Sequence, residues 1–510
     1  MKLIKRCIAV LMIATLTVGL TACSSSNKQK ENTSGTTGGT EKSYDKIVYA
    51  YATFNNIPTS ETLDTVEEAI NKITREKIGV EVELMPVAIA DYSSSVNLAL
   101  QGGDKIDIFE SLGDFNTSVS NGAAYDLTDL IDQYAPETKA TLGEDLLAAC
   151  QKDGKLYGIP SYKPYALTPM VIYKKEIADK LGIDMTQVKS INDLTDVLRK
   201  VKAAYPDMTP LVPANQGNLN MNLLAGNMDY LTDDYNSPKG VLMGDNMSVV
   251  NYYTTDVFKN ICNLVRTWYT EGLILQDAAT TTSSAAELMS ADNTFCYVAS
   301  YSYPTADTAA SLQAQTGGKP LGAVQIGDAY LDTTSINALS WMVSSTCKTP
   351  EAALKFLNLT FTDKDIINLL IYGIQDRDYV LDADGFVSYP EGQDASTVPY
   401  TAQLSCGTLG NFFLMYPMVG TSKESLAWEE EQNQLAKKSP AMGFTFDSSP
   451  VSTEYTAVSN VVSQYLPGLL CGSVDPETMI AEFNEKLTTA GFDAIIAEKQ
   501  KQLDAWLANK

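Results

Sequence analysis

A stretch near the amino terminus alternates strand-like and helix-like patterns, and this alternation constrains the fold more than any other feature. Residues 46–53, 80–84 and 106–110 are apolar or alternating runs typical of strands. Residues 62–78 and 92–100, which lie between them, carry apolar side chains at helical spacing. Strand, helix, strand, helix and strand in succession predict a parallel sheet in an α/β fold.

The rest of the chain continues the mixture of helices and strands. An extended segment at 155–173 is expected to lead out of the first sheet, and residues 176–285 are expected to be mainly helical. Strands are predicted at 294–299 and 335–343, and amphipathic helices within 475–510. At roughly 100–200 residues per domain, a chain of 510 residues suggests several domains or one large two-lobed unit.

The composition excludes several classes of function. The chain has 62 acidic and 37 basic residues and a formal net charge of −25, so it repels the phosphate backbone of nucleic acids. It has no histidine, which excludes a Ser-His-Asp triad, a Cys-His pair and an HExxH zinc site. A glycosidase needs only two positioned carboxylates, so that alternative stays open, although no glycosidase motif occurs.

The first residues indicate export. Basic side chains precede an apolar run at 7–20, which is too short for a comfortable membrane span but has the length of a signal-peptide core. The tetrapeptide LTAC, which ends at Cys23, is typical of a bacterial lipobox. We therefore predict a signal peptide at 1–22 and a diacylglycerol on the Cys23 thiol. A plain secretory signal followed by a coincidental cysteine is the alternative.

A polar segment follows the predicted lipid attachment site. Residues 24–43 have no apolar side chain with which to form a core, so residues 23–44 are expected to be the lipidated cysteine and a flexible tether. Two or more acyl chains anchor a protein stably to a membrane. The sequence therefore predicts a protein held at the extracellular face of the cell membrane.

The cysteine pattern gives no support for a metal site or a cofactor. The chain has eight cysteines, and six remain once Cys7 is removed with the signal peptide and Cys23 carries lipid. None has CxxC spacing, so we expect buried free thiols, with disulfide pairing as the alternative. Residues 380–391 resemble part of an EF-hand loop, but Val380 stands at its first position, so a β-hairpin is predicted there instead. No metal and no cofactor are expected.

Six short motifs occur in a characteristic order along nearly the whole chain. They are LQGGD at 100–104, DGKLYGIP at 153–160, VIYKK at 171–175, TPEAALKFL at 349–357, YGIQDRDYV at 372–380 and QLDAW at 502–506. Together with the lipobox and tether, they resemble the extracellular solute-binding lipoproteins of bacterial ATP-binding-cassette importers, particularly the carbohydrate-type branch in Gram-positive bacteria. One departure is that Gln375 and Arg377 stand where relatives commonly have Glu and Lys or Gly.

The resemblance implies a two-lobed, periplasmic-binding-protein-like α/β fold. Each lobe would be a sheet flanked by helices, and crossing strands would form a hinge between the lobes. Lobe 1 would comprise 45–165 plus 325–375, and lobe 2 would comprise 166–324 plus 376–510. A monomer without enzymatic activity would capture a solute between the lobes and deliver it to the membrane permease subunits of the importer.

Under this resemblance, candidate ligand contacts come from loops that follow strands, where open α/β sheets bind ligands. They are Phe54, Asn55, Asp114, Tyr162, Lys163, Tyr165, Asn215, Tyr301, Tyr303, Asn411 and Phe412. Aromatic faces suit the apolar side of a sugar ring, and polar side chains pair with its hydroxyl groups. We therefore expect a neutral oligosaccharide. The alternatives are a peptide or other solute, or a sensory role for the same fold, and any single loop tyrosine could instead be a packing residue.

Overall fold

The computed structural model describes residues 43–215, 217–300, 316–402 and 408–509. The chain divides into a first unit, Met1–Ser43, and a second unit, Tyr44–Lys510, and only the second is described below. Cys23, Tyr301 and Tyr303 lie outside the described residues, so the expectations for them stay predictions. No helix in the described part of the chain is long and apolar enough to cross a membrane.

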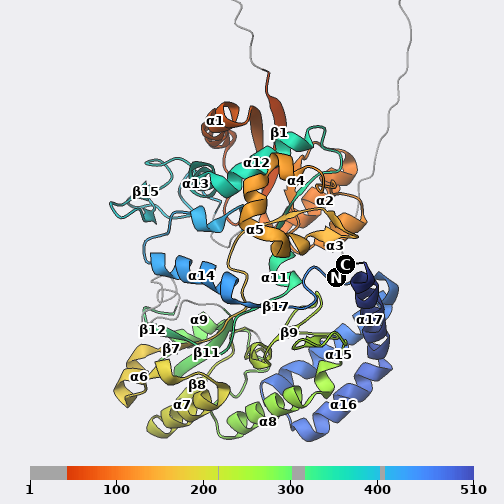
Figure 1. The fold of residues 1–510 in the computed structure, drawn as a ribbon. Helices are drawn as coiled ribbons and strands as arrows, with labels where there is room; N and C mark the ends of the chain where they lie inside the picture. Colours follow the sequence, from red (N-terminus) through yellow and green to blue (C-terminus); the bar gives the residue numbers. More distant parts are fainter. Residues whose placement is uncertain (1–42, 216, 301–315, 403–407, 510) are drawn as a thin grey trace, which may run out of the picture. The chain divides into compact units, whose positions relative to one another are not determined.

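The first lobe is built on a five-stranded sheet (Figure 1). In spatial order its strands are β2 (Val80–Ala88), β1 (Asp45–Thr53), β3 (Ile108–Glu110), β14 (Ser340–Val343) and β6 (Ile159–Pro160). β1 runs parallel to β2 and to β3, while β14 runs antiparallel to β3 and to β6. The parallel sheet predicted from the amino-terminal alternation is thereby confirmed, with two antiparallel pairings added on one side.

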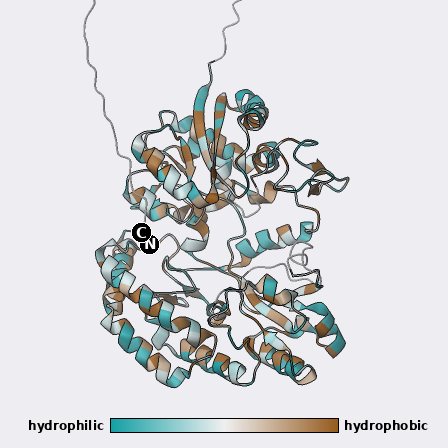
Figure 2. Ribbon diagram, turned by 180° about the vertical axis from the view of Figure 1, so that it is seen from behind, coloured by the Kyte–Doolittle hydropathy of each residue, from teal (hydrophilic) through white to brown (hydrophobic). Residues whose placement is uncertain are grey.

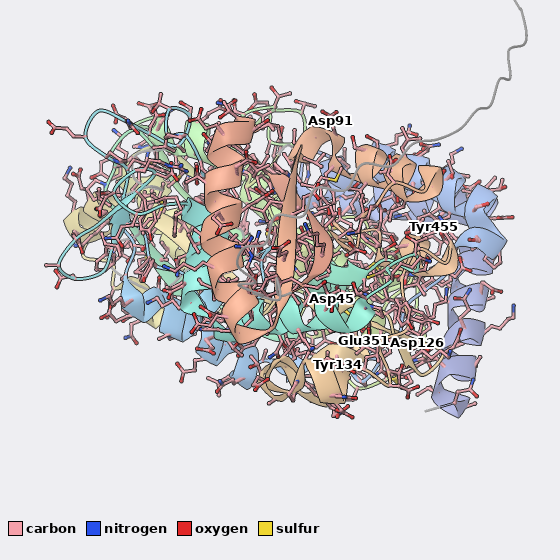
Figure 3. The ribbon with its side chains drawn as sticks, turned by 90° about the horizontal axis from the view of Figure 1, so that it is seen from above. Asp45, Asp91, Asp126, Tyr134, Glu351 and Tyr455 are labelled. Carbon is pink, nitrogen blue, oxygen red and sulfur yellow. The ribbon has the colours of Figure 1, made fainter. Side chains whose placement is uncertain are left out.

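Eight helices among the described residues belong to the part of the chain that forms this lobe. They are α1 (Ser60–Lys77), α2 (Tyr92–Gly102), α3 (Phe115–Ser120), α4 (Ile131–Tyr134), α5 (Pro136–Ala148), α11 (Thr333–Asn337), α12 (Pro350–Thr362) and α13 (Lys364–Tyr372). Asn71 joins α1 to β2, because its side chain accepts a hydrogen bond from Val82 N at 2.7 Å and donates one to Val82 O at 3.0 Å. Figure 3 labels Asp45 at the start of β1 and Asp91 just beyond β2, at opposite ends of this parallel strand pair.

The second lobe is built on a four-stranded sheet with a different topology. In spatial order its strands are β12 (Leu321–Gln325), β7 (Pro169–Lys174), β11 (Thr294–Ser300) and β8 (Thr209–Leu211). β7 is antiparallel to both β11 and β12, whereas β11 and β8 are parallel. Its helices are α6 (Lys175–Leu181), α7 (Ile191–Ala204), α8 (Asp256–Thr270), α9 (Ala285–Ser290), α15 (Ser452–Leu470), α16 (Pro476–Thr489) and α17 (Phe492–Ala508).

The expectation that residues 176–285 are mainly helical is only partly correct. Between α7 and α8 the chain is mostly irregular and contains the short strands β9 (Met228–Asp229) and β10 (Leu242–Met243). Asparagine and aspartate side chains in this segment bond to backbone amides two residues on, as Asn218 does to Asn220 N at 2.8 Å. Such local bonds compete with a helix, which explains the irregular backbone.

Apolar side chains gather in separate clusters. The first contains β1 and α12, and the second contains α8 and α17; a small third cluster lies on β7, β11 and β12 around Met170, Ile172 and Tyr297. Figure 2 shows hydrophobic colouring on the strands and more hydrophilic colouring on many helices. Residues 376–510 were expected to belong to lobe 2. Tyr379 and Tyr400 of this segment pack in the first cluster, whereas Phe444 packs in the second, so the segment contributes to both clusters.

One predicted strand is shorter than expected. The prediction covered 335–343, but α11 takes the first part and β14 begins only at Ser340. Asp332 decides this, because its side chain accepts a hydrogen bond from Ser335 N at 2.8 Å and so caps α11. Conversely, the second predicted strand runs on through Pro86 to Ala88, because β2 lies at the edge of its sheet, where proline is tolerated.

The hairpin prediction is confirmed. β15 (Val380–Leu381) pairs with β16 (Val387–Ser388) in antiparallel fashion. Asp382 Oδ1 accepts hydrogen bonds from Asp384 N and Phe386 N, both at 2.9 Å, so this carboxylate stabilises the turn. Within the described ranges, no group of three or more Cys, Asp or Glu side chains is arranged to hold a metal ion.

The prediction of free thiols is confirmed for the cysteines that the structure describes. Cys150, Cys262, Cys296, Cys347 and Cys471 are all buried and free, whereas Cys406 lies outside the described residues. Burial raises the pKa of the Cys150 thiol to about 12, although its contact with Ser340 opposes the shift. A thiol of this kind stays protonated and unreactive at neutral pH.

Candidate functional site

Three chain segments connect the first cluster to the second and third. The first runs through Leu167, which exchanges backbone hydrogen bonds with Tyr330 at 2.9 and 3.1 Å. The second includes β13 (Tyr330–Leu331), which pairs in parallel with β17 (Lys437–Lys438) of the third. The three crossings are therefore hydrogen-bonded side by side, which is the arrangement expected of a hinge of crossing strands.

Tyr162, Asn411 and Phe412 are brought together just before the first crossing. Tyr162 N donates to Gly410 O at 2.7 Å, and Phe412 N donates to Tyr162 O at 2.8 Å. The Tyr162 ring lies 5.2 Å from the ring of Phe413 in an edge-on contact. Asn411 Oδ1 accepts from Phe413 N at 3.0 Å, which holds the loop in shape. Three of the predicted ligand residues therefore share one place, although they come from positions far apart in sequence.

Lys163 and Tyr165 lie on the same crossing segment but differ in surroundings. Lys163 Nζ is 3.4 Å from the carbonyl oxygens of Pro164 and Ser335 and 5.0 Å from the centre of the Tyr165 ring. The Tyr165 side chain is fully buried, its hydroxyl donates to Ser161 O, and burial raises its pKa well above the usual value. In this structure Tyr165 is a packing residue of the hinge.

The remaining predicted ligand residues that the structure describes lie in three other places. Phe54, which is 42% exposed, and Asn55 follow β1, and the Asn55 amide donates to Ala395 O. Asp114 precedes α3 in the first lobe and lines a small pocket with Ser111. Asn215 is exposed after β8 in the second lobe. Whether these side chains contact one ligand stays a prediction.

The sequence interpretation did not include α14 (Lys423–Leu435), which contacts the hinge directly. Asn433 Oδ1 accepts from Tyr165 N at 2.8 Å and from Ala166 N at 3.2 Å, while its amide donates to Lys163 O at 2.7 Å. Trp428, on the same helix, packs against the third cluster. The run WEEEQNQ at 428–434, an aromatic residue followed only by acids and amides, was a signal that could have identified this helix.

Glu430 of α14 lies beside Tyr162. The pKa of the Tyr162 hydroxyl is raised to about 12; burial is the largest cause, and the nearby Glu430 carboxylate is the next largest. The hydroxyl therefore keeps its proton at neutral pH and can donate a hydrogen bond. Neighbouring Glu429 is half-buried, and desolvation raises its pKa to about 7.

A second feature that the sequence did not reveal is the Glu110 carboxyl at the end of β3. This side chain is 2% exposed and neither oxygen has a hydrogen-bond partner; burial raises its pKa well above the usual range. The hydroxyl groups of Tyr49 and Thr408 are also buried without partners. Trp341 links the three, because it is opposite Glu110 in the sheet, stacks on Tyr49 at 4.5 Å and donates to Thr408 O at 2.7 Å.

A cavity of about 320 Å³ lies beside the crossings on the second-lobe side. Leu167 and Tyr330 form part of its wall, together with the polar side chains of Lys189, Asn227 and Asp328. None of the predicted ligand residues that the structure describes lines it. The group formed by Tyr162, Asn411 and Phe412 and this cavity are therefore two different places at the hinge.

Comparisons with known proteins agree with this architecture. A family model described as a bacterial extracellular solute-binding protein matches residues 68–371, more than half of the chain. A model described as a domain of unknown function matches residues 440–508, which include α15, α16 and α17. The chain belongs to the bacterial extracellular solute-binding protein family, and its two α/β lobes joined by crossing strands are the fold of that family.

Individual relatives extend over almost the whole chain. A carbohydrate ABC transporter substrate-binding protein of Streptococcus pneumoniae serotype 4 is 25% identical over 501 residues, 98% of this chain and 97% of that one. The crystal structure of an N-glycan transport solute-binding protein of S. pneumoniae has a TM-score of 0.75 and 24% identity, covering 91% of this chain and 99% of that one. An HMO-binding, ABC-transporter-associated solute-binding protein of Bifidobacterium longum infantis has a TM-score of 0.61 and 17% identity, covering 91% and 99%.

Proposed function

We propose that this protein captures a neutral oligosaccharide between its two lobes and delivers it to the permease of an ABC importer. The observation that carries the proposal is the group formed by Tyr162, Asn411 and Phe412 beside α14, directly at the hinge. It combines aromatic rings with amide, hydroxyl and carboxylate groups, which is the chemistry that stacks on sugar rings and pairs with their hydroxyls. The names of the relatives, which refer to carbohydrates and N-glycans, support the same substrate class.

Because this group lies at the hinge, a solute bound there can contact both lobes at once. A solute that contacts groups on both sides of the crossings stabilises the arrangement in which those contacts form together, and only through its additional contacts there. On the first-lobe side such contacts would come from Tyr162 and Asn411, and on the second-lobe side from Asn215. The permease would then recognise the ligand-bound arrangement of the lobes.

A thermal-shift experiment tests this function. A ligand that binds only the folded state stabilises it by about 2.7 kcal/mol at a hundredfold excess over Kd. We expect a rise of several degrees in Tm with one or a few neutral glycans, N-glycans among them. Tyr162→Ala should reduce the shift, whereas Tyr269→Ala, on α8 of the second lobe, should not. Shifts with peptides and none with neutral glycans would favour the alternative, a peptide-binding or sensory protein of the same fold.

The same panel tests whether the protein only binds. We propose that it has no enzymatic activity, because the chain has no histidine and belongs to a family described as solute-binding proteins. Overnight incubation with the glycan that gives the largest shift should leave that glycan intact by chromatography. Cleavage products would contradict the proposal.

We also propose that the mature chain is a lipoprotein on the outer face of the cell membrane, anchored through Cys23. The LTAC tetrapeptide and the polar segment that follows it support this attachment. Cys23→Ala should release the protein into the medium or leave it unprocessed. Recovery of the variant in the detergent phase at the wild-type mature mass would argue against the anchor.

A further inference from the structure

The cavity of about 320 Å³ beside the crossings has walls from four separate parts of the chain. Two walls are crossing segments, represented by Leu167 in the first crossing and Tyr330 in the second. The third wall is the start of α7, and the fourth is the segment 223–230, which includes β9. A molecule in this cavity would therefore touch two of the three segments that join the lobes, together with the body of the second lobe.

Backbone hydrogen bonds hold these walls in place. Leu167 and Tyr330 exchange bonds at 2.9 and 3.1 Å, which fixes the two crossing segments side by side. In the 223–230 wall, Asn227 O accepts from Gly244 N at 2.9 Å, and β9 pairs with β10. Because the walls are already in position, a ligand does not have to order them when it binds, which lowers the cost of binding.

The greater part of the lining is apolar or aromatic. Tyr230 and Tyr330 are buried and line the cavity, together with aliphatic side chains such as Leu223, Leu224 and Ile326. A lining of this kind suits the nonpolar C–H side of a sugar ring, which it removes from water. The cavity therefore has one half of the chemistry that holds a carbohydrate.

Four polar side chains other than the tyrosines supply the other half. They are Lys189, Ser190, Asn227 and Asp328. The Ser190 hydroxyl is already engaged, because it donates to Asp193 Oδ2 at 2.9 Å and accepts from Asp193 N at 3.3 Å. The Asn227 side-chain amide bonds to no other described residue, so its donor and acceptor are both available to a ligand. Lys189 and Asp328 have opposite charges, so the lining has no net formal charge, which favours an uncharged ligand rich in hydroxyl groups.

The volume of the cavity limits the size of this ligand. Small-molecule sites typically have volumes of about 300–1,000 Å³, so this cavity is at the lower end of the range. We propose that it is a second binding site, which takes a mono- or disaccharide and is separate from the group formed by Tyr162, Asn411 and Phe412. The inference goes beyond the proposed function and does not depend on it.

Calorimetric titration of the purified protein tests the proposal. The probes are glucose, galactose, N-acetylglucosamine, lactose and maltose, with the amino acids glycine and leucine as small zwitterions. We expect saturable binding of at least one saccharide and none of the amino acids. If no saccharide binds at millimolar concentration, or if the amino acids bind and the saccharides do not, the proposal is wrong.

Variants show whether the bound saccharide occupies this cavity. Leu224 is half-buried and lines the cavity, so Leu224→Trp fills part of it and should abolish binding of the saccharide. Asn227→Ala removes the available amide and should weaken binding by about fivefold or more. Asn263→Ala, at an exposed position on α8, is the matched control and should retain the wild-type affinity. Tm values within a few degrees of the wild type would establish that the variants are folded.

The outcomes separate this inference from the proposed function. A saccharide that keeps its affinity in both Leu224→Trp and Asn227→Ala is bound elsewhere, which overturns the inference and leaves oligosaccharide capture intact. Loss of its affinity in Tyr162→Ala instead would assign it to the group at the first crossing. Conversely, if no oligosaccharide binds while a disaccharide depends on Leu224 and Asn227, the proposed function fails and the second site stands.

Discussion

Each lobe buries an ionisable side chain, but the one in the second lobe has a counter-ion and hydrogen-bond partners, whereas the one in the first lobe has none. In the second lobe, Lys499 of α17 is fully buried, and its Nζ pairs with Asp233 Oδ2 at 2.7 Å and donates to Gly240 O at 3.0 Å. In the first lobe, Glu110 is equally enclosed, yet neither of its oxygens has a partner. Burial lowers the pKa of Lys499, although Asp233 opposes that shift, and raises the pKa of Glu110.

The difference shows how each buried group affects the stability of the fold. A buried charge with a close counter-ion and further hydrogen bonds joins distant segments, here α17 and the loop around Asp233. An unpartnered buried carboxyl costs stability, since desolvation is not compensated by hydrogen bonds. Glu110 ends β3 at the edge of the sheet where ligands bind in open α/β folds.

The largest effect is expected from breaking the partnered group. Lys499→Met leaves the Asp233 carboxylate buried without its counter-ion, so the free energy of unfolding should fall by about 3–5 kcal/mol. Denaturant unfolding measures this loss. Lys501→Met is the matched control, because Lys501 pairs with Glu498 at 2.9 Å from an exposed position on the same helix. A loss below about 1 kcal/mol for Lys499→Met would contradict the structural role assigned to the pair.

A smaller loss is expected where α14 joins the hinge. Asn433→Ala leaves two backbone amides and one carbonyl without their side-chain partner, so the free energy of unfolding should fall by about 2 kcal/mol. Water that enters the gap would reduce this cost. Thermal and denaturant unfolding measure it, and Glu431→Ala, at an exposed position on α14, should show little change. An Asn433→Ala variant as stable as the wild type would show that these bonds do not fix the helix.

The unpartnered Glu110 carboxyl should make the stability of the protein depend on pH. Its folded-state pKa is raised, so the unfolded chain releases the proton first, and the contribution of Glu110 to stability is lost as pH rises between the two pKa values. The slope can reach about 1.4 kcal/mol per pH unit. Glu110→Gln cannot ionise, so its stability relative to the wild type should increase with pH. Glu83 is exposed, so Glu83→Gln is the control and should show no such trend. A stability difference between Glu110→Gln and the wild type that does not change with pH would contradict the raised pKa of Glu110.

The smallest loss of unfolding free energy is expected from breaking an exposed ion pair, which serves as the reference for the buried pair of Lys499 and Asp233. Arg199 makes two bonds to Glu271, both at 2.8 Å, but the two side chains are 49% and 36% exposed. Arg199→Gln should cost less than about 1 kcal/mol, and the difference should shrink in 1 M salt. Unfolding at two salt concentrations checks this, and a loss comparable with that of Lys499→Met would remove the contrast between buried and exposed pairs.

Much of the fold could be predicted from local patterns. The alternation that predicted the parallel strands corresponds to β1, β2 and β3, with α1 and α2 between them. Turn residues were equally informative, because Gly79 after α1 has φ +70°, a conformation that favours glycine. The candidate site was less predictable. Tyr162, Asn411 and Phe412 lie together, as loops that meet in space can, but local patterns did not indicate that Tyr165 would be buried, that α14 would contact the hinge or that Glu110 would lack partners.

The sequence by itself determined the order of strands and helices, the hairpin near Gly385, the exclusion of histidine chemistry and the likeness to solute-binding proteins. Only the tertiary structure decided which residues meet at the hinge, since Asn433 and Lys163 are 270 positions apart and Lys499 and Asp233 are 266 apart. Periodicity and turn preference act over a few residues, so they can be read along the chain. Contacts between distant segments, and the loss of water around Glu110 or Lys499, exist only once the chain has closed on itself.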